Sequence, residues 1–210
     1  RWFIMHKLLS PNNLRAYEVS KYNLRFMDTE PIAGRNEITE ISIRDGFGDQ
    51  IFHSYIQPHN CSLDIAEHKG IKSSSLESAP HLESIYPAIK SFIYKKVIVA
   101  WNMEREIELF PDRLKCAKYL VCCMKRLSPM FGNFSVKFNN YNKVNMWDAY
   151  RAWNLNYNDD LIEHRASSDT KVLYYLWVEA NKIQSNILPK KENIIYFQSE
   201  NIKNYTENVF

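Results

Sequence analysis

The chain has 210 residues, of which 45% are hydrophobic and 24% are charged, and its formal net charge is +3. These values are ordinary for a globular protein with one domain and a real core, and no apolar run approaches the roughly 20 residues that span a bilayer. The four cysteines form no CxxC pair and show no disulfide-framework spacing, which excludes a disulfide-built scaffold and favours reduced thiols in a cytoplasmic protein.

The predicted elements begin with three strands. Residues 22–28 form an apolar run, residues 37–45 alternate isoleucines with polar side chains, and residues 50–58 make a third strand. The short segment DGFGD, residues 45–49, is rich in turn formers and joins the second strand to the third. Two strands joined in this way predict an antiparallel hairpin.

Helices and one further strand follow. Between residues 79 and 96 apolar side chains recur at helical spacing, and the β-branched run 96–102 predicts a short buried strand. A helix is predicted from Met103 to about Pro111. The remaining predicted helices cover residues 145–154 and 166–181. This order of elements is typical of an α/β or α+β domain.

The same pattern divides the chain into three parts. Residues 22–180 form the predicted domain, and residues 1–21 form an N-terminal extension. Residues 181–210 are rich in Asn and Lys and have no clear period, so we expect a C-terminal arm or tail there.

Two carboxylates, Asp28 and Glu30, stand two residues apart at the end of the first predicted strand. Side chains two apart in a strand point to the same face, so these two would lie side by side and repel each other. A bound cation, a shared proton or exposure to solvent would each relieve the repulsion. These two residues alone do not show which of the three explanations is correct.

A second acidic cluster lies in AWNMEREIELF, residues 100–110. On a helix, Glu104 and Glu108 share one face and Glu106 points elsewhere. Acidic side chains also stabilise the positive end of a helix dipole, and this is the simpler explanation for the cluster taken alone.

The third cluster, EHRASSDTKVLYYLW, contains His164 and Asp169, five residues apart. Five steps of about 100° place two side chains far apart around a helix. The two could meet only if His164 lies on the loop before the helix and Asp169 lies in its first turns. Ser167 or Ser168 would then be the residue that caps the helix.

A basic and aromatic stretch runs from Arg113 to Trp147 and contains no Asp or Glu. Its seven cations alternate with aromatic residues. Cations for phosphates and rings for base stacking predict a surface for single-stranded nucleic acid. A solvated helix face followed by an aromatic core segment explains the same pattern, and both interpretations stay open.

Read together, the three clusters resemble the three motifs of the DEDDh-type 3′–5′ exonuclease family, which includes the proofreading epsilon subunit of bacterial DNA polymerase III. The matching stretches are FMDTE, VIVAWNMEREIELF and EHRASSDTKVLYYL, in the family's order and approximate separation. The resemblance makes residues 22–180 an exonuclease domain. It implies a ribonuclease H-like α/β fold, in which a mixed sheet of about five strands, the first three antiparallel, is flanked by helices.

The middle motif departs from the family pattern, which usually reads His-Asn-x-x-Phe-Asp. Asn102 is kept, whereas Trp101 replaces the His and Arg105 replaces the Phe. Glu106 stands where the family has Asp. A glutamate still offers oxygen to Mg²⁺, but its extra methylene displaces the carboxylate.

The resemblance also implies the chemistry and the residues that perform it. Asp28, Glu30, Glu106 and Asp169 would hold two Mg²⁺ or Mn²⁺ ions, and His164 would be the general base. The side chains expected to contact the substrate are Thr29, Trp101 and Asn102. The expected partner is the 3′ end of single-stranded DNA or RNA, cut to nucleoside 5′-monophosphates, and a homodimer is possible because many relatives form one.

Three functions remain open at this point. The first is a metal-dependent 3′-to-5′ exonuclease. The second is an exonuclease-fold module that binds nucleic-acid ends and cuts poorly, which Glu106 would explain. The third is a different enzyme on a related sheet, such as a nucleotide phosphohydrolase.

Overall fold

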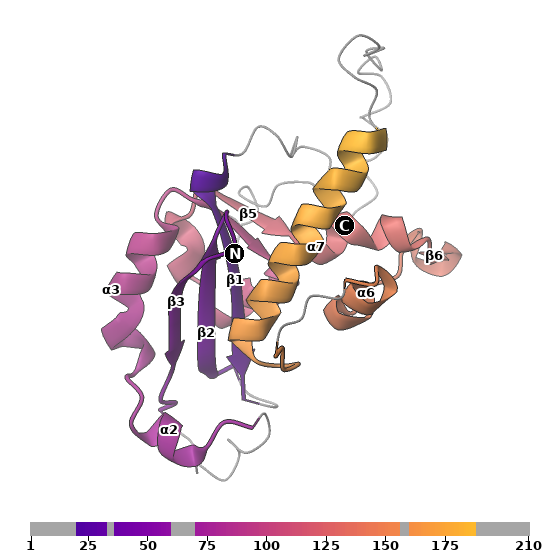
Figure 1. The fold of residues 1–210 in the computed structure, drawn as a ribbon. Coiled ribbons are helices and arrows are strands. Elements are labelled where there is room, and N and C mark those ends of the chain that lie inside the picture. Colours follow the sequence, from indigo (N-terminus) through magenta and orange to yellow (C-terminus); the bar gives the residue numbers. More distant parts are fainter. Residues whose placement is uncertain (1–19, 33–35, 60–69, 156–159, 188–210) are drawn as a thin grey trace.

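The fold is built on one five-stranded mixed sheet, seen in a computed structural model that describes residues 20–32, 36–59, 70–155 and 160–187 (Figure 1). The sheet has the order β3-β2-β1-β4-β5. Its strands are β1 (Leu24–Pro31), β2 (Ile38–Asp45), β3 (Gln50–Tyr55), β4 (Val97–Ala100) and β5 (Tyr119–Cys122). The first three strands pair antiparallel, whereas β4 runs parallel to β1 and β5 parallel to β4.

Helices connect and cover these strands. Those of the described residues are α2 (Ser73–Glu77), α3 (Leu82–Ile93), α4 (Met103–Leu109), α5 (Cys123–Leu127), α6 (Met146–Ala152) and α7 (Ala166–Ile187). Short 3₁₀ turns occupy Lys21–Asn23, Arg113–Cys116, Ser128–Phe131 and Val136–Phe138. A separate two-stranded hairpin, β6 (Phe134–Ser135) and β7 (Asn140–Tyr141), stands between α5 and α6. No described helix combines the length and the hydropathy needed to cross a bilayer.

Ring contacts show which helix covers which face of the sheet. The Phe26 ring meets Trp177 of α7 with centroids 6.0 Å apart, and Phe52 of β3 meets Phe92 of α3 at 5.7 Å. Since side chains alternate along a strand, Met27 lies on the opposite face from Phe26. The sheet is therefore covered by α7 on one face and by α3 on the other, as Figure 1 shows.

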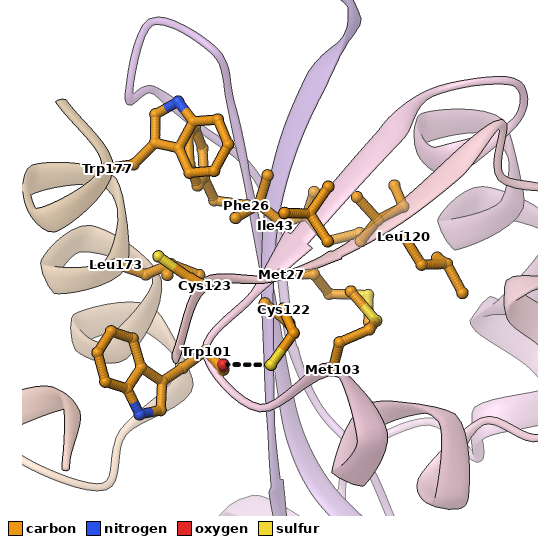
Figure 2. Packing of buried hydrophobic residues seen from close by; sticks show 14 of the residues in the cluster. Phe26, Met27, Ile43, Trp101, Met103, Leu120, Cys122, Cys123, Leu173 and Trp177 are labelled. Carbon is orange, nitrogen blue, oxygen red and sulfur yellow. Dashed lines mark hydrogen bonds between the residues drawn. The ribbon is translucent and has the colours of Figure 1, made fainter. Parts of the chain in front are cut away.

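The core lies where the central strands meet α7 and α4. Strand β4 has the sequence VIVA and is buried along its whole length, as a strand covered on both faces requires. Figure 2 shows Trp101 and the neighbouring thiols of Cys122 and Cys123 within this packed cluster. Cys122 Sγ lies 3.3 Å from the Trp101 carbonyl oxygen, to which it donates. Both cysteines are free thiols.

The structure confirms the predicted α/β fold, with five strands and the first three antiparallel. The turn at residues 45–49 also forms as predicted, and Gly48 adopts a φ of +94° there against the Tyr174 ring. Strand β5 is the fifth strand of the sheet, for which the sequence had given no residue range. Helix α7 continues to Ile187, beyond the predicted end at residue 181.

Most of the predicted N-terminal extension and C-terminal tail, residues 1–19 and 188–210, lie outside the described residues.

Candidate active site

Strand β1 carries both carboxylates of the first motif toward α7. Asp28 and Glu30 share the face of Phe26, and both lie inside the strand, because β1 continues to Pro31 rather than ending at residue 28. Glu30 is buried and Asp28 is half-buried. The register places Glu30 opposite Glu40 of β2, and the pairing shifts directly after Glu30. The expected side-by-side carboxylates therefore sit where the regular ladder ends.

The third motif meets this strand end. His164 is exposed on the loop before α7 and has a left-handed φ of +61°, and Asp169 is buried in the first turn of the helix. One ligand atom each of Glu30, His164 and Asp169 lie within 4.8 Å of one another. This is the arrangement that the five-residue spacing required for His164 and Asp169 to meet.

The predicted cap of α7 is wrong. Ser167 and Ser168 lie inside the first turn, and Ser168 Oγ instead accepts a hydrogen bond from the Ile162 N–H at 3.0 Å. The N–H of Ala166 donates to Glu40 Oε2 at 3.2 Å, so a side chain from β2 stabilises the start of the helix. Local sequence could not show this, because the capping group comes from a distant strand.

Glu40 is a fully buried carboxylate that the sequence analysis did not single out. His53 Nε2 lies 2.8 Å from Glu40 Oε1, and Arg165 Nε donates to Glu40 Oε2 at 3.0 Å. Burial raises the pKa of Glu40, but the hydrogen bonds from His53 and Arg165 outweigh it and hold the pKa below its ordinary value. Arg165 also donates to the Tyr55 hydroxyl and stacks on that ring. The backbone between His164 and Asp169 is therefore anchored to the sheet.

Helix α6 adds a second contact that the sequence analysis missed. Trp147 Nε1 donates to Asp169 Oδ1 at 2.9 Å, and both side chains are buried. Helix α6 starts at this point because the Asn145 side chain accepts hydrogen bonds from the N–H groups of Trp147 and Asp148. The cap was readable in the sequence, but nothing local indicates that the indole meets Asp169. This bond fixes the position of one oxygen of the Asp169 carboxylate.

The middle motif approaches β1 differently from the other two. Glu106 of α4 is buried, and Thr29 Oγ1 donates to its Oε2 at 2.8 Å. Burial, together with the charge of Glu30, raises the pKa of Glu106 to about 8 although the Thr29 hydrogen bonds oppose this. Neither Glu106 nor Asp28 belongs to the close group of Glu30, His164 and Asp169. The carboxyl of Glu106 is therefore largely protonated at neutral pH when no cation lies beside it.

The three predicted substrate contacts have different surroundings. Trp101 is only 8% exposed and packs in the core, and Thr29 is buried against Glu106. Asn102 starts α4 and is partly exposed. Its Oδ1 atom is buried and has no hydrogen-bond partner among the described residues.

The residues present fit a divalent cation. Two buried carboxylates, Glu30 and Asp169, bring their oxygens close together, and like charges so placed repel unless a cation or a proton lies between them. Carboxylate oxygens are the ligands that Mg²⁺ prefers, and Mn²⁺ accepts an imidazole as well. The group of Glu30, His164 and Asp169 can therefore hold such an ion.

Comparison with known families supports a nuclease. The family model described as Exonuclease matches residues 32–177. The matched range begins just after Glu30 and contains Glu106, His164 and Asp169. No curated protein matched the sequence of the chain.

Solved nuclease structures share the fold. A structure of exonuclease X in complex with 5′ overhanging duplex DNA aligns with a TM-score of 0.54 and 18% identity, covering 78% of this chain and 93% of that one. A structure of the 3′-end specific recognition of histone mRNA stem-loop by a 3′-exonuclease gives a TM-score of 0.56 and 15% identity. That alignment covers 79% of this chain and 65% of the other. At these identities the likeness concerns the fold.

Proposed function

The chain belongs to the Exonuclease family, and from that premise we propose that it is a metal-dependent 3′-to-5′ exonuclease of the DEDDh type. The observation that carries the proposal is the meeting of Glu30, His164 and Asp169, whose ligand atoms lie within 4.8 Å of one another. Two carboxylates and an imidazole at that spacing suit metal-assisted phosphodiester hydrolysis. Residues 22–180 form the proposed catalytic domain.

Each residue then has a role in the proposed reaction. Asp28, Glu30 and Asp169 would hold one Mg²⁺ or Mn²⁺ ion, and Glu106, together with Asp28, would hold the second, directly or through water. Bound at these residues, divalent cations would supply Lewis-acid chemistry, because they would polarise the phosphodiester and lower the pKa of water. His164, which is exposed, accepts the proton of the attacking water as general base. The product is a nucleoside 5′-monophosphate released from the 3′ end.

Among the three predicted substrate contacts we favour Asn102. Its side chain is partly exposed at the start of α4, although the Oδ1 atom itself is buried. Trp101 and Thr29 are buried, so their proposed part is to support the site from the core side. A cytoplasmic location and a homodimer remain predictions.

The test uses single-stranded DNA and RNA oligomers labelled at the 5′ end, incubated with Mg²⁺, Mn²⁺ or EDTA. We expect a ladder of shortened products that needs metal and disappears in Glu30→Gln and Asp169→Asn. Asp148→Asn is the matched control, because Asp148 is an exposed carboxylate of α6 that pairs with Arg151 instead. Shortening that persists in EDTA, or that is lost equally in Asp148→Asn, would contradict the proposal.

A second function, binding of nucleic-acid ends with weak hydrolysis, is favoured by Glu106 alone. Its carboxyl is held by Thr29 and is largely protonated near neutral pH, so it must lose a proton before it can hold an ion. Glu106→Asp removes one methylene and restores the family's residue. A large gain in hydrolysis with unchanged oligomer binding would favour the end-binding function for the natural chain, and a loss of hydrolysis would favour the enzyme.

A further inference from the structure

The seven cations of the basic stretch fall into two groups in the structure. Four of them already contact other side chains of the chain: Arg113 pairs with Glu83, Lys115 with Asp112 and Lys125 with Glu104, and Arg126 lies 4.2 Å from the Trp177 ring centroid. Lys118 lies over the Tyr119 ring. From Arg113 to Arg126, packing at the surface and in the core therefore explains the basic stretch better than a nucleic-acid surface does.

The remaining part is the β6–β7 hairpin, residues 134–141, which presents apolar side chains to solvent. Phe134 is 49% exposed, Phe138 is 71% exposed and Val136 is 87% exposed. Phe134 and Tyr141 are paired in register, and their rings meet edge-on with centroids 5.2 Å apart. Large apolar side chains gathered on one small exposed element indicate a binding surface rather than ordinary surface composition.

The charge around these rings indicates the kind of partner. Lys137 Nζ lies 5.3 Å from the Phe138 ring centroid, and Lys143 follows the hairpin. Neither lysine pairs with a carboxylate in the part of the chain that the structure describes. Lysine is depleted at the cores of protein–protein interfaces, whereas exposed rings beside unpaired cations suit bases and phosphates. The hairpin therefore matches an anionic, aromatic strand better than an apolar protein surface.

The hairpin is connected directly to the candidate active site. Five residues separate Tyr141 from Trp147, whose indole donates to Asp169. The six residue steps between them span at most about 20 Å, so a bound strand of several nucleotides can reach from the active site to the hairpin. Phe131 stacks on Trp153, the residue directly after α6, with centroids 5.3 Å apart, and this contact holds the segment before the hairpin against the end of that helix. Figure 1 shows the hairpin beyond α6, on the side away from α3.

We propose that the β6–β7 hairpin binds the single-stranded part of a nucleic-acid substrate several nucleotides upstream of its 3′ end. Phe134 and Phe138 stack on bases, and Lys137 contacts a phosphate. The direction of the strand rests on the proposed exonuclease function, whereas the binding itself does not depend on hydrolysis. A dinucleotide has both of its nucleotides at the scissile bond, so it leaves none for the hairpin.

The first test measures binding alone. Fluorescence anisotropy of a 5′-labelled strand of about 20 nucleotides is followed in EDTA for the natural chain, Phe134→Ala, Phe138→Ala and Lys137→Gln. Base stacking on a ring contributes about 1–3 kcal/mol, so each ring variant should weaken binding roughly fivefold to a hundredfold. Lys137→Gln should reduce the slope of log affinity against log salt by about 0.7, the value for one phosphate contact to a single strand.

Tyr94 and Lys95 provide the matched control. Tyr94 is 51% exposed at the end of α3, and Lys95 Nζ lies 5.2 Å from its ring centroid, so the pair repeats the chemistry of Phe138 and Lys137 outside the hairpin. Tyr94→Ala and Lys95→Gln should bind as the natural chain does. Phe138→Trp keeps an aromatic ring and should also retain binding.

Three results would overturn the proposal. One is equal affinity of the hairpin variants and the natural chain. Another is a Phe138→Trp variant as weak as Phe138→Ala, which would mean that stacking is not the interaction. The third is a change of oligomeric state in the hairpin variants with unchanged strand binding, because a second copy of the chain would then cover these rings.

The second test separates this surface from the proposed function. Hydrolysis of a dinucleotide and of the longer strand is compared with Mn²⁺ present. The hairpin variants should raise KM for the long strand and leave dinucleotide hydrolysis unchanged. If the natural chain binds through the hairpin but never shortens the strand, the exonuclease function is refuted and the binding surface is not. If the hairpin variants hydrolyse long strands as the natural chain does, the binding surface is refuted and the exonuclease function is not.

Discussion

Replacing Glu106 by Gln removes a titratable carboxyl from the protein interior and keeps an oxygen that can accept from Thr29. The burial of Glu106 raises its folded-state pKa from 4.5 to about 8. Below pH 4.5 the group is protonated in the folded and the unfolded chain, so it adds no pH dependence. Between pH 4.5 and about 8 the unfolded chain releases this proton while the folded chain keeps it, and stability falls as pH rises.

The size of the effect follows from the same linkage. Each pH unit in this interval lowers the free energy of unfolding by up to about 1.4 kcal/mol, so the loss reaches about 3 kcal/mol at pH 7. Above pH 8 both states are ionised and the dependence levels off. The variant lacks the group, so it should gain stability relative to the natural chain by about this amount between pH 4.5 and pH 7.

Urea unfolding in EDTA at a series of pH values measures the difference between the two chains. All other titrating groups are common to both, so the difference isolates residue 106. Glu108→Gln on the same helix is the control, because that side chain is 60% exposed and pairs with Arg105 at the surface. Its free energy of unfolding should stay within about 1 kcal/mol of that of the natural chain, because an exposed ion pair contributes little. A Glu106→Gln difference that is constant with pH, or that grows in the opposite direction, would refute the assignment of a raised pKa.

Three further changes test the supports of the site and the core. Trp147→Phe keeps the ring but removes the donor to Asp169, and it should weaken Mn²⁺ binding about tenfold in a direct metal titration. Glu40→Gln leaves Arg165 without its buried counter-charge and should cost about 3 kcal/mol of unfolding free energy in urea at pH 7. Because the pKa of Glu40 is lowered, the natural chain keeps this contribution above pH 4.5 and loses it as pH falls further, so the difference between the two should shrink in acid. Ile98→Ala, in the fully buried strand β4, should cost about 2–5 kcal/mol in the same assay.

The spacing of apolar residues along the chain was enough to predict several strands and helices. Alternation along residues 37–45 and helical spacing along residues 79–96 correspond to β2 and α3. Strand β5 was not located, because YLVC is a four-residue apolar run inside a basic stretch. Periodicity cannot assign so short a run to a strand or a helix. Pairing with β4 decides it.

Contacts between residues far apart in the chain could not be predicted from local sequence patterns. Glu40 lies on β2 and meets Arg165 across 125 residues of sequence, and Trp147 meets Asp169 from another helix. Glu40 shares its face of β2 with Ser42 and Arg44, so a glutamate at this position is a weak signal by itself. It acquires meaning only from the register that sets Glu40 opposite Glu30.

Glu106 could be located from the sequence, whereas the surroundings of its carboxyl could not. Its position in the middle motif follows from spacing to Asn102, and sequence comparison with the family finds it without any structure. The surroundings of its carboxyl do not follow from spacing, because Thr29 lies on the opposite face of β1 from Asp28 and Glu30. The longer side chain reaches Thr29 and is held there in a protonated state near neutral pH. Binding of a cation at this carboxyl must therefore release a proton, so we expect metal affinity to rise with pH until about 8 and then to level off.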